Sequence, residues 1–151
     1  MTRPRILRRG IAVAFVACAL SVAGCSSSKH STTSLTGSLW NLGSFSGTGQ
    51  HPTPAATSSK PATLTFAQGA RVAGFTGCNS FTGTYRLSAS QLTISPQLTT
   101  HTRCPTTALS QQETAINRQL PQVRGYDIAS DVLKLTGATG QTLLTYNLRA
   151  R

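Results

Sequence analysis

Beyond residue 38 the chain repeatedly alternates apolar and polar side chains. In residues 62–67, for example, Leu64 and Phe66 alternate with Thr63 and Thr65. Alternation with a period of two is typical of strands that bury one face. The pattern predicts strands at residues 39–45, 62–67, 71–75, 81–87, 91–95, 123–129, 132–136 and 141–148, with Pro96 ending the fifth. Residues 46–60 are polar and rich in Gly, Pro and Ser, and they are expected to form a long loop.

Residues 106–120 follow a different period. Leu109, Ile116 and Leu120 recur at helical spacing, which predicts one helix that ends near Pro121. Two residues fit the N-cap of this helix. One is Thr106, and the other is Ser110, which opens a capping box that Glu113 closes.

The connections between consecutive strands are too short for parallel crossovers, so neighbouring strands are expected to be antiparallel. The predicted fold class is therefore mainly β (α+β): a small antiparallel β-barrel or half-barrel of about eight strands with one helix, because closure hides the edges of so small a sheet. The residues expected to supply most of the core are Trp40, Phe66, Phe75, Phe81, Tyr85, Leu109, Ile116 and Leu144.

The start of the chain looks like an export signal. Four arginines precede residues 11–24, an uncharged stretch of apolar and small residues that is too short to span a bilayer. The stretch ends in Val22-Ala23-Gly24-Cys25, which resembles a bacterial lipobox, so Cys25 is expected to carry a lipid such as palmitate. The alternatives are an ordinary signal peptide and, from Arg8-Arg9, twin-arginine export.

These signals divide the chain into three parts: a lipoprotein signal peptide at 1–24, a flexible polar tether at 25–37 and a folded domain at 38–149. The expected location is the extracytoplasmic side of the cell membrane or cell envelope. The chain is expected to be a monomer that reaches the membrane through the lipid on Cys25.

Charge and composition narrow the function. The whole chain has 14 basic and three acidic residues, and without residues 1–24 it keeps ten basic against three acidic, a net charge of about +7. So few carboxylates argue against a glycosidase pair, a calcium site or an aspartic dyad. Because the basic residues are dispersed and the chain is expected to be exported, nucleic acid is not the expected partner. Anionic headgroups, acidic envelope polymers and a merely soluble surface all remain consistent with the excess of cations.

The four cysteines differ by position. Cys18 lies in the apolar stretch and Cys25 is the lipidation site, which leaves Cys78 and Cys104 in the folded part. Two such cysteines outside the cytoplasm are expected to pair, and closing this loop would stabilise the fold by about 3 kcal/mol. A metal or redox pair is the competing interpretation, although the spacing matches neither a CxxC motif nor a zinc pattern.

A run from Gly74 to Tyr85, followed by Thr100, Cys104 and Glu113, resembles the META domain family, also called the HslJ-like family of bacterial envelope lipoproteins. The residues that fall on the family pattern are Trp40, Gly74, Gly77, Cys78, Asn79, Gly83, Tyr85, Thr100, Cys104 and Glu113. Two positions depart from it: Ser80 stands where Arg is frequent, and 101–103 replaces a Met-rich stretch. The resemblance implies a small β-barrel with one helix, an envelope location and, for some members, a link to stress, with no assigned catalytic residues.

The residues themselves offer little catalytic chemistry. Among the three histidines only His101 lies in the expected ordered core, where Cys78, Asn79 and His101 could form a nucleophile set if Cys78 were not oxidised. Asn79 is instead expected to cap backbone groups or adopt positive φ in a bend, and Glu113 to hydrogen-bond that bend.

The expected function is a lipid-anchored, non-catalytic binding domain linked to the envelope stress response. Neither a cofactor nor a metal is expected, and the partner is an envelope protein or a hydrophobic ligand. The alternative is an envelope enzyme that uses Cys78 or acts on acidic polymers.

Overall fold

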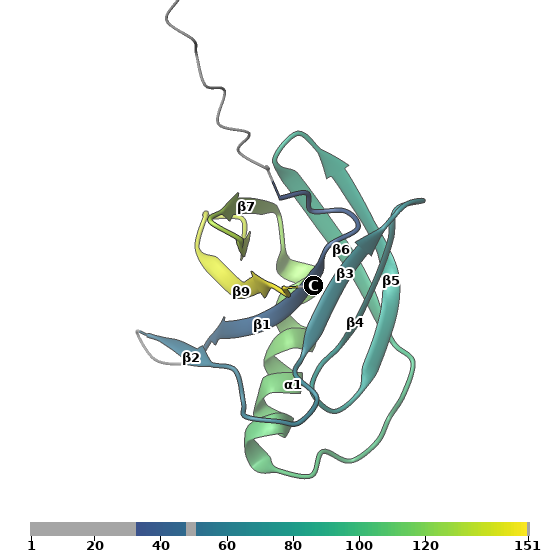
Figure 1. Cartoon of the computed structure of the whole chain (residues 1–151), viewed down its shortest axis with the longest axis vertical. Helices are drawn as coiled ribbons and strands as arrows, with labels where there is room; N and C mark the ends of the chain where they lie inside the picture. Colours follow the sequence, from purple (N-terminus) through teal and green to yellow (C-terminus); the bar gives the residue numbers. More distant parts are fainter. Residues whose placement is uncertain (1–32, 48–50, 151) are drawn as a thin grey trace, which may run out of the picture. The chain divides into compact units, whose positions relative to one another are not determined.

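The computed structural model describes residues 33–47 and 51–150. The predicted signal peptide, Cys25 and most of the predicted tether lie outside these ranges. Within them the chain forms one antiparallel sheet and one α-helix (Figure 1). The strands are β1 (Leu39–Ser46), β2 (Pro52–Pro54), β3 (Thr63–Ala67), β4 (Arg71–Phe75), β5 (Ser80–Ser88), β6 (Gln91–Leu98), β7 (Gly125–Ala129), β8 (Val132–Thr136) and β9 (Thr142–Leu148).

The sheet closes on itself. Its strand order is β2-β1-β3-β4-β5-β6-β7-β8-β9, and β1 also pairs with β9, so eight of the described strands form a ring from which β2 extends. The pairing is uneven, because β6 and β7 share a single residue pair, Gln91 with Gly125. The predicted mainly β class with about eight antiparallel strands and one helix is confirmed.

The predicted long loop contains a strand. Pro52–Pro54 pairs with the end of β1, where Phe45 faces Thr53. The segment has two prolines and no alternation of apolar residues, so its sequence does not predict a strand. Its pairing with β1 makes it a three-residue edge strand, a position in which proline is tolerated.

Pro96 does not end the fifth predicted strand, as β6 continues to Leu98. Thr99, just after β6, donates its backbone N–H to the carbonyl of Ser80 in β5. With this register the backbone N–H groups of odd-numbered residues in β6 point toward β5, and the backbone nitrogen of Pro96 points away from β5. At Pro96 the strand has no neighbour on that other side, since β7 meets β6 only at Gln91. Proline is tolerated there because no ladder bond requires its missing N–H.

The packed body begins before residue 38. Leu35 is buried, and Thr36 forms a bridge with Phe66 of β3. Trp40, which is fully buried, donates its indole N–H to the carbonyl of Leu35 at 3.4 Å. Residues 33–37, assigned to the tether by their polar sequence, are therefore held on the body by the buried side chain of Leu35 and by hydrogen bonds such as that from Gly37 N–H to Phe66 O at 2.9 Å.

The inward faces of the strands supply the core inside the ring. Its largest fully buried apolar side chains include Trp40, Phe66, Phe81 and Tyr146. All of the predicted core residues are buried except Phe75, which is half-buried because it ends β4 next to a bend.

The helix α1 (Thr107–Gln119) continues into a short 3₁₀ turn, η1 (Leu120–Gln122), and is seen in the lower half of Figure 1. It packs on β1 and β9 through a face that includes Leu109, Ala115 and Ile116. No helix in the described ranges has both the length and the apolar character needed to cross a membrane.

Candidate functional site

The bend between β4 and β5 forms the centre of the candidate site. Residues 76–79 connect Phe75 and Ser80, which face each other as a strand pair, and Thr76 closes the bend by donating its N–H to the carbonyl of Asn79 at 2.8 Å. Gly77 adopts φ +97°, a conformation that residues with a Cβ rarely accept. The predicted bend is confirmed, and Gly77, not Asn79, has the positive φ.

The Asn79 side chain joins this bend to the loop after β6. Its Oδ1 accepts hydrogen bonds from Thr102 N (2.6 Å) and Thr100 Oγ1 (2.9 Å), and its Nδ2 donates to Thr102 O (2.8 Å). The residue is 2 % exposed. An amide that both donates to and accepts from one backbone unit fixes the loop much as a strand partner would. Asn79 therefore caps backbone groups, as predicted.

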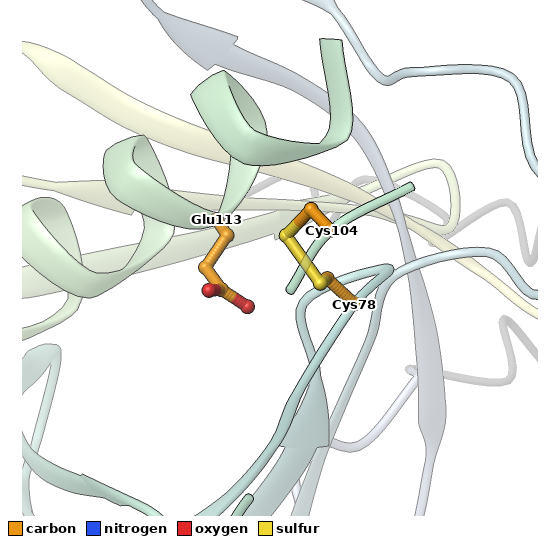
Figure 2. Close-up of side chains that lie close together, drawn as sticks. All are labelled: Cys78, Cys104 and Glu113. Atoms are coloured by element: carbon orange, nitrogen blue, oxygen red, sulfur yellow. A yellow bond between two sulfur atoms is a disulfide. The ribbon is translucent and has the colours of Figure 1, made fainter. Parts of the chain in front are cut away.

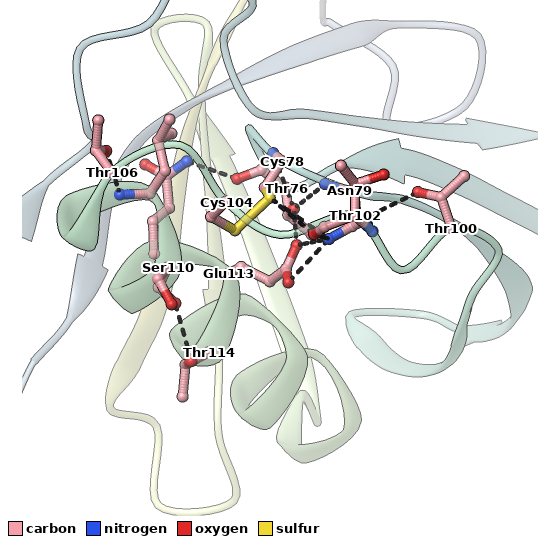
Figure 3. The surroundings of a disulfide bond; sticks show 12 residues. Thr76, Cys78, Asn79, Thr100, Thr102, Cys104, Thr106, Ser110, Glu113 and Thr114 are labelled. Carbon is pink, nitrogen blue, oxygen red and sulfur yellow. Dashed lines mark hydrogen bonds between the residues drawn. A yellow bond between two sulfur atoms is a disulfide. The ribbon is translucent and has the colours of Figure 1, made fainter.

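Glu113 joins the bend to the helix. Its Oε2 accepts from Thr76 Oγ1 at 2.6 Å, and both carboxylate oxygens accept from Asn79 Nδ2, at 3.1 and 2.9 Å (Figure 3). The neighbouring Gln112 donates to Thr76 O at 2.6 Å and accepts from Ala56 N at 2.7 Å. The predicted hydrogen bond from Glu113 to the bend is present.

Cys78 and Cys104 form a disulfide, as expected, with their Cα atoms 5.3 Å apart. Both residues are half-buried. The Glu113 side chain extends from the helix beside this disulfide, and its ligand oxygen and the two sulfurs lie within 4.8 Å of one another (Figure 2). The disulfide thus joins the bend to the loop after β6, and the buried Asn79 amide and the half-buried Glu113 carboxylate join the bend to that loop and to the helix.

The other residues of the family pattern lie elsewhere and act in packing. Tyr85 donates its hydroxyl to Ala67 O at 3.2 Å and stacks edge-on against Phe66, with ring centroids 5.1 Å apart. A Cβ on Gly74 would collide with the carbonyl of Thr63, and one on Gly83 with that of Ser95. Both glycines let neighbouring strands approach closely.

His101 is exposed and lines a surface hollow of about 400 Å³ together with Arg103, Cys104 and Glu113. The Glu113 oxygens take their hydrogen bonds from Thr76 and Asn79. His51 lies far along the chain, next to β2, and is exposed as well. Asn79 and His101 of the predicted nucleophile set line the same hollow, and Cys78, the third member, is in the disulfide.

Three residues of this site were not predicted from the sequence. Thr76 is fully buried, and its hydroxyl and carbonyl bind both Glu113 and Gln112. Thr102 supplies the backbone unit that Asn79 holds. Gln112 had one usable signal, since it lies on the same helical face as Leu109 and Ile116 and a buried glutamine requires hydrogen-bond partners.

The fold and site define a class of protein: a ring of antiparallel strands whose end is held by a disulfide and by a helix-borne glutamate. The sequence matches the META domain family over residues 33–150. The chain belongs to the META domain family. Among curated proteins, no match is found.

Solved structures share the architecture. An NMR structure of a protein from Burkholderia xenovorans is 24% identical, with a TM-score of 0.63 over 78% of this chain and 85% of that chain. A second NMR structure is 27% identical, with a TM-score of 0.57 over 74% of this chain and 88% of that one. The crystal structure of a DUF4847 family protein from Bacteroides vulgatus is 15% identical, with a TM-score of 0.55 over 78% and 96% of the two chains.

Proposed function

We propose that this META domain protein is a lipid-anchored protein of the cell envelope that acts by binding and not by catalysis. One observation carries the proposal: the groups at the site that could do chemistry are engaged in internal bonds. Both sulfurs are in the disulfide, and the carboxylate of Glu113 and the amide of Asn79 hold backbone and side chains of their own fold. Such a site makes one end of the ring rigid and leaves substrate no free nucleophile.

The surface charge indicates the kind of partner. Eight basic residues are exposed on the described part of the chain: Lys60, Arg71, Arg86, Arg103, Arg118, Arg124, Lys134 and Arg149. The acids there are Glu113, which points inward to the bend, and the exposed Asp127 and Asp131. A surface with this excess of cations favours anionic headgroups or acidic polymers, to which each nearby cation adds about 1 kcal/mol at low salt.

Fractionation of cells that express the full-length chain tests the anchor. The unchanged chain is expected in the membrane fraction at any salt concentration, because an acyl anchor is insensitive to ionic strength. Cys25→Ala should move to the soluble extracytoplasmic fraction in high salt and remain partly membrane-bound in low salt. Cys18→Ala is the matched control and should behave as the unchanged chain. Retention at high salt of Cys25→Ala chains that have lost residues 1–24, as shown by their intact mass, would contradict the lipid anchor.

A second experiment separates binding from catalysis and examines the proposed link to envelope stress. A deletion strain exposed to heat or envelope stress is complemented with the chain or with His101→Ala. A binding protein should complement fully without this exposed imidazole, whereas an enzyme that uses the Cys78, Asn79 and His101 set should fail. Alkylation of Cys78 in the native chain before any reduction would likewise favour the enzyme.

A further inference from the structure

We propose that the chain binds one Zn²⁺ through Cys78, Cys104 and Glu113 when the disulfide between the two cysteines is reduced. The supporting observation is the convergence of these three side chains from three separate segments. Each offers one ligand atom, and the three atoms lie within 4.8 Å of one another (Figure 2). This inference is independent of the proposed binding function.

The ligand chemistry suits zinc. Zn²⁺ binds thiolate sulfur at about 2.3 Å and carboxylate oxygen at about 2.0–2.2 Å in a tetrahedron, which places neighbouring ligand atoms about 3.6 Å apart. The Glu113 ligand oxygen lies within 4.8 Å of both sulfurs, so a small side-chain movement brings it to this separation. The two sulfurs have only to move apart from their covalent bond, which side-chain rotation allows without the backbone following, since the Cα atoms are 5.3 Å apart.

The surroundings of Glu113 resemble the outer shell of a metal site. Thr76 Oγ1 and Asn79 Nδ2 donate to its oxygens at 2.6 and 2.9 Å and so fix the direction in which the carboxylate points. Partners of this kind orient ligands and typically change metal affinity by about 10–100-fold when they are removed. Asn79 Nδ2 also lies 3.5 Å from Cys78 Sγ.

A fourth ligand can come from the solvent-open hollow beside the site. His101 lines this hollow together with Cys104 and Glu113, so either its imidazole or a water molecule can complete the tetrahedron. Arg103 lines the same hollow, and its charge opposes a cation. Two thiolates and one carboxylate carry three negative charges, which outweigh this one arginine.

The redox step needs an external dithiol. A thiolate of the dithiol attacks one sulfur of the disulfide, and its second thiol then resolves the mixed disulfide. Two electrons pass to the chain, the dithiol leaves as a disulfide, and Cys78 and Cys104 become thiols. Binding of Zn²⁺ then displaces the two thiol protons. Disulfide and zinc are thus alternative ways of joining the same two segments.

Cobalt spectroscopy of the full-length chain tests this. A Cys18→Ser/Cys25→Ser background leaves Cys78 and Cys104 as the only cysteines. It is purified in detergent, reduced with a phosphine without oxygen, and titrated with Co²⁺. One equivalent should produce thiolate-to-cobalt charge-transfer and tetrahedral d–d absorption, and Zn²⁺ should abolish both. The oxidised chain should show neither. A reduced chain that gives no such spectrum, whether folded or unfolded by circular dichroism, overturns the proposal.

Two matched carboxylate variants test the third ligand in the same background. Glu113→Gln keeps the shape and the acceptor oxygen but removes the charge, and it should weaken Zn²⁺ binding at least tenfold in competition with a chelator. Asp127→Asn, at an exposed position on β7, should leave the affinity unchanged. Equal affinities for Glu113→Gln and the background, or an equal loss in both variants, would show that Glu113 is not a ligand.

Discussion

Gly77 illustrates how a single residue positions the site. Its backbone has φ +97°, and a Cβ at this position would lie 2.6 Å from Gln112 Nε2 and 2.9 Å from Leu109 Cδ2. Gln112 is the residue that ties the helix to Thr76. A side chain on Gly77 would therefore both strain the bend and push away the helix that holds it.

Gly77→Ala is expected to lower the free energy of unfolding by about 2–4 kcal/mol, from backbone strain together with overpacking. Urea unfolding followed by circular dichroism measures this. Gly140→Ala is the matched control, because Gly140 has φ +82° and nothing within 4 Å of its would-be Cβ. It should show the strain alone, about 1–2 kcal/mol. Equal losses in the two variants would mean that the close approach at Gly77 is unimportant.

Within the helix, one of the two predicted N-caps, Thr106 or Ser110, is the observed one, and it is Thr106. Thr106 has an extended backbone, with φ −134° and ψ 155°, and its Oγ1 accepts from Leu109 N at 3.2 Å. Ser110 lies one turn inside α1 and donates its own N–H to Thr106 O at 3.0 Å. The helix thus begins early enough for Gln112 and Glu113 to reach the bend.

Thr106→Ala should reduce stability by about 1 kcal/mol, because one N–H of the first turn loses its acceptor. Ser110→Ala is expected to change stability by less than about 0.5 kcal/mol, since this exposed residue lies within the helix. Thermal unfolding of both variants compares the two candidates directly. A larger loss for Ser110→Ala would contradict the observed cap.

For the whole molecule, stability depends on how the ring closes. Tyr146 of β9 faces Leu42 of β1 on one side and Leu133 of β8 on the other, at the closure of the ring. The residue is 1 % exposed, and burial raises the pKa of its phenol well above the usual value. The phenol can ionise readily only when the ring opens.

This burial predicts a loss of stability in alkali. The folded state has the higher pKa, so the contribution of Tyr146 is complete below its unfolded pKa near 10 and declines as the pH rises above it. The expected slope is about 1.4 kcal/mol per pH unit between the two pKa values. Urea unfolding of the unchanged chain and of Tyr146→Phe between pH 8 and about pH 11 isolates the contribution of the Tyr146 phenol to the free energy of unfolding. All other titrating groups are present in both proteins, so their effects cancel in the difference. Parallel curves would refute it.

The positions of most strands, the helix and the disulfide could be predicted from the sequence, because each depends on local or compositional rules. Alternation of apolar residues marks strands such as β3 and β8, and helical spacing marks α1. The prediction failed where a partner strand, or its absence, decides the outcome. The strand β6 continues through Pro96 because no strand lies on the side to which its backbone nitrogen points. Residues Pro52–Pro54 form β2 because they pair with the end of β1.

The candidate site divides in the same way. Asn79, Glu113 and the two cysteines are recognisable as residue types in a family pattern, and the bend around Gly77 follows from local chain preferences. The hydrogen bonds from Thr76 to Glu113, from Asn79 to Thr102 and from Gln112 to Thr76 come only from the tertiary structure. The partners in these bonds are 23 to 37 positions apart, and only the folded ring and helix bring them together. The buried members, Thr76, Asn79 and Gln112, must each find such a partner.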